Sequence, residues 1–201
     1  MEKYYSSIKP FEKRKKRRPF FRMLKAIMKV FFPKDRFIWK GRKPKENEPF
    51  IFVCNHTKIY APLTFLLNYD KPIRPWSNSY LLTYKECAHH MLYNVLENRK
   101  PKFLLYPLIL LMLPFIVWFF RSMDVIPVYK QDRRIEITFE KAVKTIEEGV
   151  HQIVFPEKKE NKVNDYIFEL KRGFAYVAKQ YYDKSGKIMN IKQLKNYKGE
   201  T

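Results

Sequence analysis

The sequence has few cysteines, few glycines and few acidic residues. Only Cys54 and Cys87 occur among its 201 residues, which excludes a disulfide framework and makes a reducing compartment the simpler expectation. Glycine occurs 5 times, whereas aromatic residues make up 17% of the chain. This composition excludes a disordered nucleic-acid-binding tail, because such tails are poor in aromatic residues. We expect no cleavable signal peptide, because no uncharged apolar segment with a small-residue cleavage site follows the first basic run.

The shortage of acidic residues leaves a strongly basic chain. Asp and Glu number 20 against 41 Lys and Arg, which gives a formal net charge of +21. A chain this basic attracts phosphate groups, whether on nucleic acid, on anionic lipid or on a phosphorylated small molecule. Its length is sufficient for one sizeable core. We therefore expect a single domain with additional segments, and a partner that carries phosphate.

Residues 1–45 are predicted to form a basic tail and an interfacial amphipathic helix. Within residues 19–33, the cations Arg22, Lys25 and Lys29 share one helical face, and apolar side chains cover most of the remaining surface. A basic stripe on an otherwise apolar helix is typical of a helix that lies in a membrane interface. A helix that packs into the protein core is the alternative.

Residues 49–67 organise the rest of the chain. Phe50 to Cys54 are five apolar residues that predict a buried strand, and a helix is predicted from Ala61. Asn55 and His56 stand between the two. A strand that ends in this pair places an imidazole at the carboxyl edge of a sheet, where open α/β sheets bind their ligands. His56 is therefore the candidate catalytic residue.

The remaining segments alternate between strand and helix patterns. This alternation predicts an α/β fold with a mostly parallel sheet flanked by helices, within a domain that covers residues 46–191 and precedes a polar tail at 192–201. Pro127 indicates that its strand lies at an edge of the sheet or contains a bulge, because proline cannot donate to the hydrogen-bond ladder. The expected strands are 72–78 (at most a short one), 125–129 and 152–155, and the expected helices are 83–97, 133–148 and 165–182.

The apolar run at residues 103–120 is the segment most suited to lipid. A straight helix of this length would nearly cross a bilayer, but Pro107 and Pro114 argue against a straight helix, and basic residues flank both ends. If residues on both sides of the run build one site, they must also lie on one side of the membrane. We therefore predict a re-entrant or monotopic Pro-kinked hairpin that stays within one leaflet or within the protein. A true span is the alternative.

Two other groups are not expected to carry chemistry. His89 and His90 are adjacent on a predicted helix, where their side chains diverge by about 100° and cannot easily share a metal ion. We predict no metal site. Cys54 lies in the predicted buried strand, where burial gives an inert thiol rather than a nucleophile.

Three motifs in a fixed order carry a resemblance to a known family. Asn55-His56, the segment 125–130 and Phe155-Pro156-Glu157 each follow or end a predicted strand. In this order they resemble the phospholipid/glycerol acyltransferase family, which includes the lysophosphatidic acid acyltransferases, over residues 50–179. The resemblance implies transfer of a fatty acyl group from acyl-CoA or acyl carrier protein to a lysophospholipid or glycerol-phosphate hydroxyl. It also implies no permanently bound cofactor, no nucleic acid partner, and a place on the cytoplasmic face of the cell membrane, in phospholipid biosynthesis.

The resemblance assigns roles to the residues of the first motif. His56 would be the general base that deprotonates the acceptor hydroxyl, with Asn55 beside it. An Asp orients this imidazole in the family, and Ala61 occupies its position here. A backbone carbonyl, Tyr60 or Glu157 would have to accept a hydrogen bond from the second ring nitrogen instead.

The other motifs supply cations for a phosphate group. Lys130 stands where the family has an Arg, which keeps the charge but loses the bidentate geometry. Lys158 and Lys159 follow Glu157 where the family has a glycine turn and an Arg. Residues 188–191 begin a segment like the strand of the family's fourth motif. The expected substrate-binding residues are Asn55, Lys130, Glu157, Lys158 and Lys159.

Two alternatives to an enzyme remain open. The alanine at position 61 and the altered third motif also fit a catalytically inactive relative that binds lipid or a partner at the membrane surface. Nucleic-acid binding through the basic surface is the weaker alternative.

Overall fold

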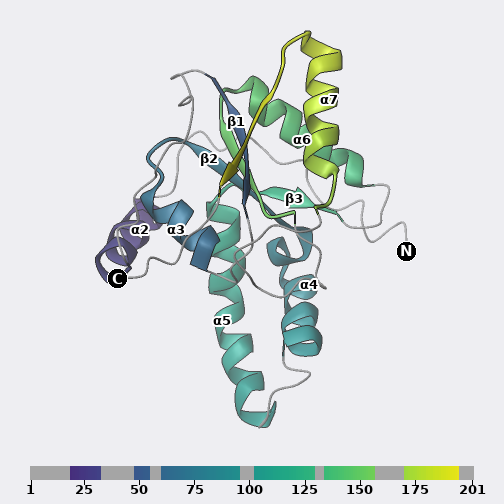
Figure 1. Cartoon of the computed structure of the whole chain (residues 1–201). Helices are drawn as coiled ribbons and strands as arrows, with labels where there is room; N and C mark the ends of the chain where they lie inside the picture. Colours follow the sequence, from purple (N-terminus) through teal and green to yellow (C-terminus); the bar gives the residue numbers. More distant parts are fainter. Residues whose placement is uncertain are drawn as a thin grey trace.

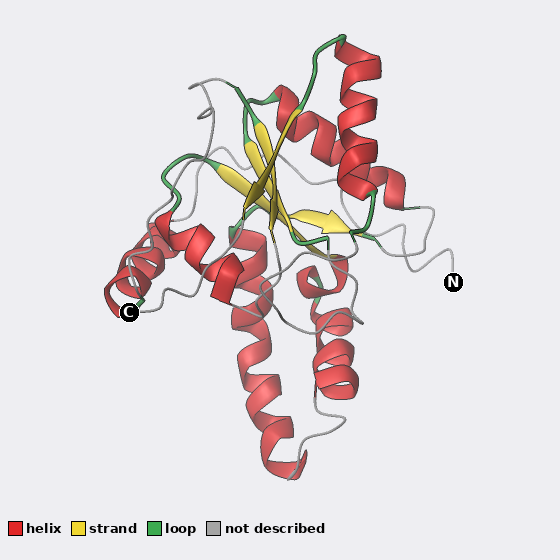
Figure 2. Ribbon diagram, viewed as in Figure 1, coloured by secondary structure: helices red, strands yellow, loops and turns green. Residues whose placement is uncertain are grey.

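The computed structural model describes residues 19–32, 48–54, 60–95, 102–129, 134–156 and 170–194. In this part of the chain five parallel strands form one sheet in the order β3-β2-β4-β1-β5, and helices flank it (Figures 1 and 2). The predicted α/β fold is confirmed. The strands are β1 Phe50–Cys54, β2 Ile73–Asn78, β3 Ile126–Val128, β4 His151–Val154 and β5 Asn190–Leu194. The helices are α2 Pro19–Phe31, α3 Tyr60–Asn68, α4 Tyr84–His89, α5 Lys102–Ser122, α6 Ile135–Glu147 and α7 Gly173–Ser185, with a 3-10 turn η1 Ser79–Leu82 and a π-helical segment η2 His90–Val95.

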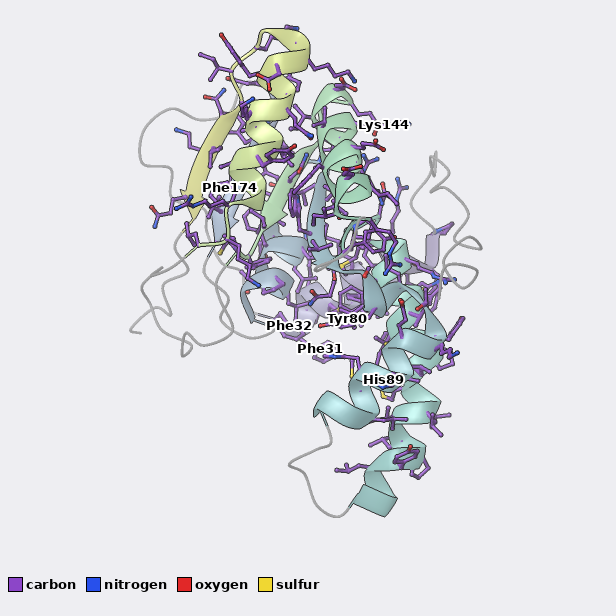
Figure 3. All side chains as sticks on the ribbon, turned by 90° about the vertical axis from the view of Figure 1, so that its right-hand side faces the viewer. Phe31, Phe32, Tyr80, His89, Lys144 and Phe174 are labelled. Atoms are coloured by element: carbon purple, nitrogen blue, oxygen red, sulfur yellow. The ribbon has the colours of Figure 1, made fainter. Side chains whose placement is uncertain are left out.

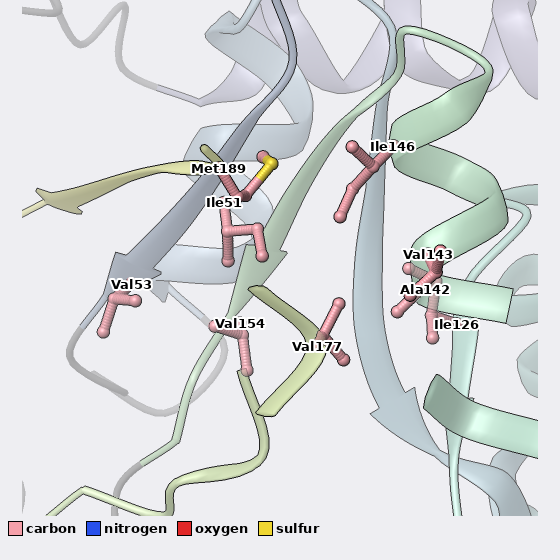
Figure 4. Packing of buried hydrophobic residues seen from close by; sticks show 9 residues of the cluster. All are labelled: Ile51, Val53, Ile126, Ala142, Val143, Ile146, Val154, Val177 and Met189. Carbon is pink, nitrogen blue, oxygen red and sulfur yellow. The ribbon is translucent and has the colours of Figure 1, made fainter. Parts of the chain in front are cut away.

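β1 is buried on both faces, as its uninterrupted apolar sequence predicts. Ile51 and Val53 point into a core built with α6 and α7 (Figure 4). The opposite face of β1 carries Phe50, Phe52 and Cys54. There they form a second core with Phe65, which lies in α3, and with Tyr69, which directly follows α3. Alternate residues of a strand face opposite sides of the sheet. The sheet is therefore the middle layer of three.

The two edge strands gave one correct prediction and one wrong one. β3, which contains Pro127, lies at the edge of the sheet as expected. A polar tail was predicted from Lys192, but β5 continues to Leu194 and pairs in parallel with β1, with Lys192 opposite Phe52. β5 lies at the other edge, and Ile191 and Gln193 are exposed. A strand in that position can carry polar residues, so the apolar pattern that marks a buried strand is missing.

The helices on the α6–α7 side match the expected pattern except at one end. α6 covers the predicted amphipathic segment, with Ala142, Val143 and Ile146 buried. The next helix was predicted from Asp165, but α7 begins at Gly173, and residues 170–172 are not helical. In this stretch Leu170 forms a bridge and the backbone N–H of Lys171 donates to the carbonyl of Pro156 at 2.8 Å. This contact ties the residues before α7 to the end of β4, and positions 165–169 of the predicted helix lie outside the described residues.

The apolar run forms one helix, not a hairpin folded within residues 103–120. α5 continues through Pro107 and Pro114, and residues 105–122 are long and apolar enough to cross a membrane by length and composition. Leu113 and Val117 pack against Cys87 of α4. Figures 1 and 3 show α4 and α5 side by side, projecting away from the sheet. The run is thus one arm of a larger helical hairpin, whose other arm is α4 with η2.

A charged network fixes the return of this hairpin to the sheet. α5 is followed by Asp124, whose backbone is left-handed at φ 55°. The guanidinium of Arg74 in β2 donates to Asp124 Oδ2 at 2.6 Å, to Glu148 Oε2 at 2.8 Å and to Thr145 Oγ1 at 3.0 Å. Multiple charge-assisted hydrogen bonds of this kind hold their partners in one geometry. β2, the end of α5 and the end of α6 are therefore tied together.

A buried histidine links the amino ends of two strands. The backbone N–H of Phe50 donates to His151 Nδ1 at 3.2 Å, and His151 is only 2% exposed among Phe50, Phe52 and Tyr69. Burial lowers the pKa of His151 from 6.5 to about 4, and the nearby charge of Lys71 acts in the same direction. The imidazole is therefore neutral at pH 7 and accepts a hydrogen bond from the next strand.

Replacing His151 with Gln is expected to remove a pH-dependent part of the stability. The unfolded chain binds more protons than the folded protein between pH 6.5 and about 4, so the contribution of His151 is present above pH 6.5 and is lost as the pH falls towards 4. Between pH 7 and pH 5 the wild type should lose roughly 2 kcal/mol more of its free energy of unfolding than His151→Gln does. Urea unfolding at both pH values measures this difference. Equal losses in the two proteins would contradict it.

Candidate functional site

At the carboxyl edge of the sheet, the strands that lead to the first and third motifs end next to each other. β1 and β4 are direct parallel neighbours, with Val53 opposite Val154. The first motif follows Cys54 at the end of β1, and Glu157 follows Phe155-Pro156 at the end of β4. Two segments a hundred residues apart in sequence therefore leave the sheet from adjacent positions. In Figure 1 the arrowheads of β1 and β5 point towards the side on which α3, α4 and α5 lie.

The predicted site side chains themselves lie outside the described residues. This applies to Asn55, His56, Lys130, Glu157, Lys158 and Lys159. The strands that lead to them do not lie at equal distances. β3, which leads to Lys130, is three strand positions from β1, and neighbouring strands are about 4.8 Å apart. The start of the Lys130 segment is thus roughly 14 Å from β1 across the sheet.

The described residues next to the second and third motifs are buried and held by hydrogen bonds. Tyr129, the last described residue before Lys130, is buried, and its N–H donates to Thr138 Oγ1 at 3.3 Å, while the guanidinium of Arg134 lies 4.6 Å from its ring centroid. Pro156 is buried, and its carbonyl accepts the Lys171 bond described above. The second and third motifs therefore start from fixed points in the protein.

A polar cluster at the end of β2 was not recognised from the sequence. Asn78, the last residue of β2, donates from Nδ2 to the hydroxyl of Tyr80 at 2.8 Å. The Tyr80 ring stacks on His90 with centroids 4.1 Å apart. Burial raises the pKa of Tyr80, and Cys87 adds to this effect. The sequence, in which His90 follows His89, raises only metal binding as a role for His90. The signal that singles out Asn55, a polar residue at a strand end, also applies to Asn78.

The described residues give no sign of a metal centre. Within these ranges no three His, Cys, Asp or Glu side chains gather to hold an ion. His90 stacks on Tyr80, whereas His89 is exposed on α4 (Figure 3). Both cysteines are buried, and burial raises the pKa of Cys87, which makes it a poor nucleophile.

The structure places position 61 at the start of a helix. α3 begins at Tyr60, one residue before the predicted start, so Ala61 is its second residue. The first turn of a helix is where a carboxylate is favoured by the helix dipole and by unpaired backbone N–H groups. A family-type Asp at this position would therefore sit at a site suited to its charge.

Comparison with known proteins agrees with this architecture. A family model described as Acyltransferase matches residues 86–190, just over half of the chain. The matched segment includes the second and third motifs and begins after Asn55 and His56. No curated protein and no solved structure matches the chain. The order of the motifs, the parallel sheet that joins their strand ends and the match over residues 86–190 lead to one conclusion: this chain belongs to the phospholipid/glycerol acyltransferase family.

Proposed function

We propose that the protein transfers a fatty acyl group from an acyl thioester to the hydroxyl of a lysophospholipid or glycerol phosphate at the cytoplasmic surface of a membrane. The observation that carries this proposal is the parallel pairing of β1 with β4, since it starts the His56 segment and the Glu157 segment from neighbouring strand ends. The family match supports acyl transfer in general. The strong positive charge favours an acceptor or a surface that carries phosphate.

In the proposed reaction His56 acts as the general base. Its imidazole accepts the proton of the acceptor hydroxyl as the oxygen attacks the thioester carbonyl. The tetrahedral intermediate then breaks its C–S bond, and the proton held by His56 passes to the leaving thiolate. An ester and a free thiol are the products, and His56 returns to its neutral form. The thiol belongs to coenzyme A or to acyl carrier protein.

The remaining predicted residues would hold the acceptor. Positive charge for its phosphate would come from Lys130, which follows β3 in sequence, and from Lys158 and Lys159, which follow β4. Asn55 and Glu157 would support the reacting groups. Lysines bind phosphate as point charges rather than through a fixed bidentate fork, so each contributes attraction more than orientation.

The direct test compares the wild type with His56→Ala. With palmitoyl-CoA or palmitoyl-acyl carrier protein and lysophosphatidic acid, the wild type should form phosphatidic acid and release thiol, and the rate of His56→Ala should be about two to four orders of magnitude lower. Lys192→Ala, a change at the polar end of β5, serves as a control that retains activity. Equal background in the wild type and His56→Ala would contradict the proposal.

A binding protein without catalytic activity is the second candidate. The specific observation that favours it is Ala61 in the first turn of α3, where the family has its orienting carboxylate. A wild type that sediments with lysophosphatidic acid vesicles, yet releases no thiol with either donor, would support this candidate over the enzyme.

A further inference from the structure

Two helices of the protein expose large apolar faces. On α5, Leu111 is 78% exposed, and Leu108, Met112 and Phe115 are exposed with it. On α2, Val30 is 80% exposed, on the same side of the helix as other exposed apolar residues. Exposed patches of this kind on a folded protein mark an interaction surface. The exposed apolar residues of α2 are Phe20, Met23, Ile27, Val30 and Phe31.

An aromatic cluster joins the two faces, although they lie about ninety residues apart in sequence. The Phe20 ring meets the Trp118 ring edge-on, with centroids 5.1 Å apart, and Phe21 lies 5.8 Å from Phe119. Phe115, on the exposed face of α5, is 5.8 Å from Trp118. Phe21 is buried in this contact. The exposed residues of α2 and α5 are therefore parts of one surface, which we call the α2–α5 surface.

The charges around the α2–α5 surface have one sign. Neither α2 nor α5 contains an acidic residue. Arg22 and Lys29 are exposed on α2, on a different face of the helix from its exposed apolar residues, and Arg121 lies at the end of α5. An amphipathic helix with an apolar face and a basic polar face is complementary to a bilayer that carries anionic lipid, because the apolar side chains enter the acyl boundary while the long basic side chains reach the phosphates.

The other arm of the hairpin decides how α5 can enter lipid. α4 packs along α5 through Cys87 and carries Lys85, Glu86 and His89. Charged groups on α4 are costly in hydrocarbon. α5 can therefore offer lipid only the face that α4 does not cover, and a crossing would draw the polar arm into the bilayer with it. Because a crossing would carry Lys85 and Glu86 of α4 into hydrocarbon, α5 fits a position along the interface better than a crossing.

We propose that the α2–α5 surface docks on an anionic bilayer with α5 lying in the plane of the interface, and that α5 does not cross the membrane. This deepens the proposed function, which locates acyl transfer at a membrane surface. Membrane docking can be measured without an acyl donor, so a failure to dock and a failure to catalyse acyl transfer can be told apart.

Vesicle binding tests the docking surface. The wild type should bind vesicles of phosphatidylglycerol and phosphatidylcholine, more weakly as salt rises and much more weakly when the vesicles are pure phosphatidylcholine. The double variant V30E/L111E should weaken binding by about tenfold or more. The matched control is Ile188→Glu, because Ile188 is 82% exposed but precedes the amino end of β5, whereas α5 lies on the side towards which β5 points (Figure 1). Circular dichroism of each variant before lipid is added verifies that it is folded.

Depth measurement tests the orientation of α5 without relying on a loss of binding. Leu111 lies near the middle of α5, so in a spanning helix a Leu111→Trp side chain would reach the bilayer centre. If α5 lies in the plane of the interface, the same side chain stays near the headgroups. The tryptophan fluorescence added by Leu111→Trp, relative to the wild type, should be quenched more by lipids brominated at acyl carbons 6 and 7 than at carbons 11 and 12.

Four results would overturn the proposal. The first is stronger quenching of the Leu111→Trp fluorescence by bromine at carbons 11 and 12 than at carbons 6 and 7, and the second is equal affinity of the wild type for anionic and neutral vesicles. The third is an equal loss of vesicle binding in V30E/L111E and Ile188→Glu. The fourth is a wild type that binds no vesicles and forms a dimer in lipid-free solution, which V30E/L111E abolishes. The last would assign the α2–α5 surface to a second copy of the chain.

Discussion

Replacing Ala61 with Asp is expected to raise the rate of acyl transfer by up to about four orders of magnitude, the amount that loss of an orienting carboxylate costs in hydrolytic triads. The carboxylate would accept a hydrogen bond from the second nitrogen of His56, fix its tautomer and stabilise the imidazolium that forms during attack. Position 61 is the second residue of α3, where the helix dipole favours a negative charge. Turnover with lysophosphatidic acid and palmitoyl thioester measures the gain.

Two further variants separate this explanation from others. Ala61→Asn has nearly the same shape as Ala61→Asp without the charge, so it should give a much smaller gain. The double variant H56A/A61D should show no gain, because the carboxylate acts only through the imidazole. A gain that survives the loss of His56, or no gain with an unchanged fold, would show that His56 and position 61 do not meet in the proposed way.

The second large effect concerns stability. Arg74→Met should lower the free energy of unfolding by about 3–5 kcal/mol, because it leaves Asp124 and Glu148 without the guanidinium that both contact. All three side chains are at most 24% exposed, so water replaces the lost hydrogen bonds poorly. Lys141 remains nearby: burial lowers its pKa to about 8, and Arg74 contributes to that lowering. Loss of Arg74 should therefore bring the pKa of Lys141 closer to its ordinary value.

An exposed ion pair provides the matched control. Lys179 and Asp183 form an i,i+4 pair on α7, and the Lys179 side chain is largely exposed. Lys179→Met should lower the free energy of unfolding far less than Arg74→Met does, because water readily replaces the contacts of an exposed pair. Urea unfolding of both variants compares the two pairs directly. A loss in Arg74→Met that is no larger than the loss in Lys179→Met would contradict a structural role for the Arg74 network.

Most of the sheet and its helices could be predicted because their patterns are local. Five consecutive apolar residues predicted β1, and the spacing of Ala142, Val143 and Ile146 predicted α6. Pro127 predicted an edge strand or a bulge because it lacks an N–H group, and β3 lies at an edge. Each of these signals is complete within a few residues and needs no distant partner.

The errors arose where distant contacts override the local pattern. β5 is polar, and only its pairing with β1 identifies it as a strand. The N–H of Lys171 bonds to the carbonyl of Pro156 at the end of β4, and α7 begins two residues later. α5 passes through two prolines because each removes only one backbone hydrogen bond, while Leu113 and Val117 pack against α4 along the same helix.

The candidate site could be predicted in part. The sequence predicted that the first and third motifs each follow a strand, and the structure adds that these two strands, β1 and β4, are neighbours in the sheet. The cluster of Asn78, Tyr80 and His90 could not be found in the same way, since its three members come from a strand end, a 3-10 turn and a π-helical segment. Those irregular elements have no sequence period that would reveal a shared position.

The aromatic contact between Phe20 and Trp118 has a consequence for how lipids would reach the sheet. A protein that rests on a bilayer through one helix can roll about the axis of that helix. Contact between the start of α2 and the end of α5 opposes this rotation, and the Arg74 network holds the end of α5 close to β2. An acceptor headgroup would then approach His56 from a constant direction, which would select one hydroxyl of a glycerol backbone over its neighbour.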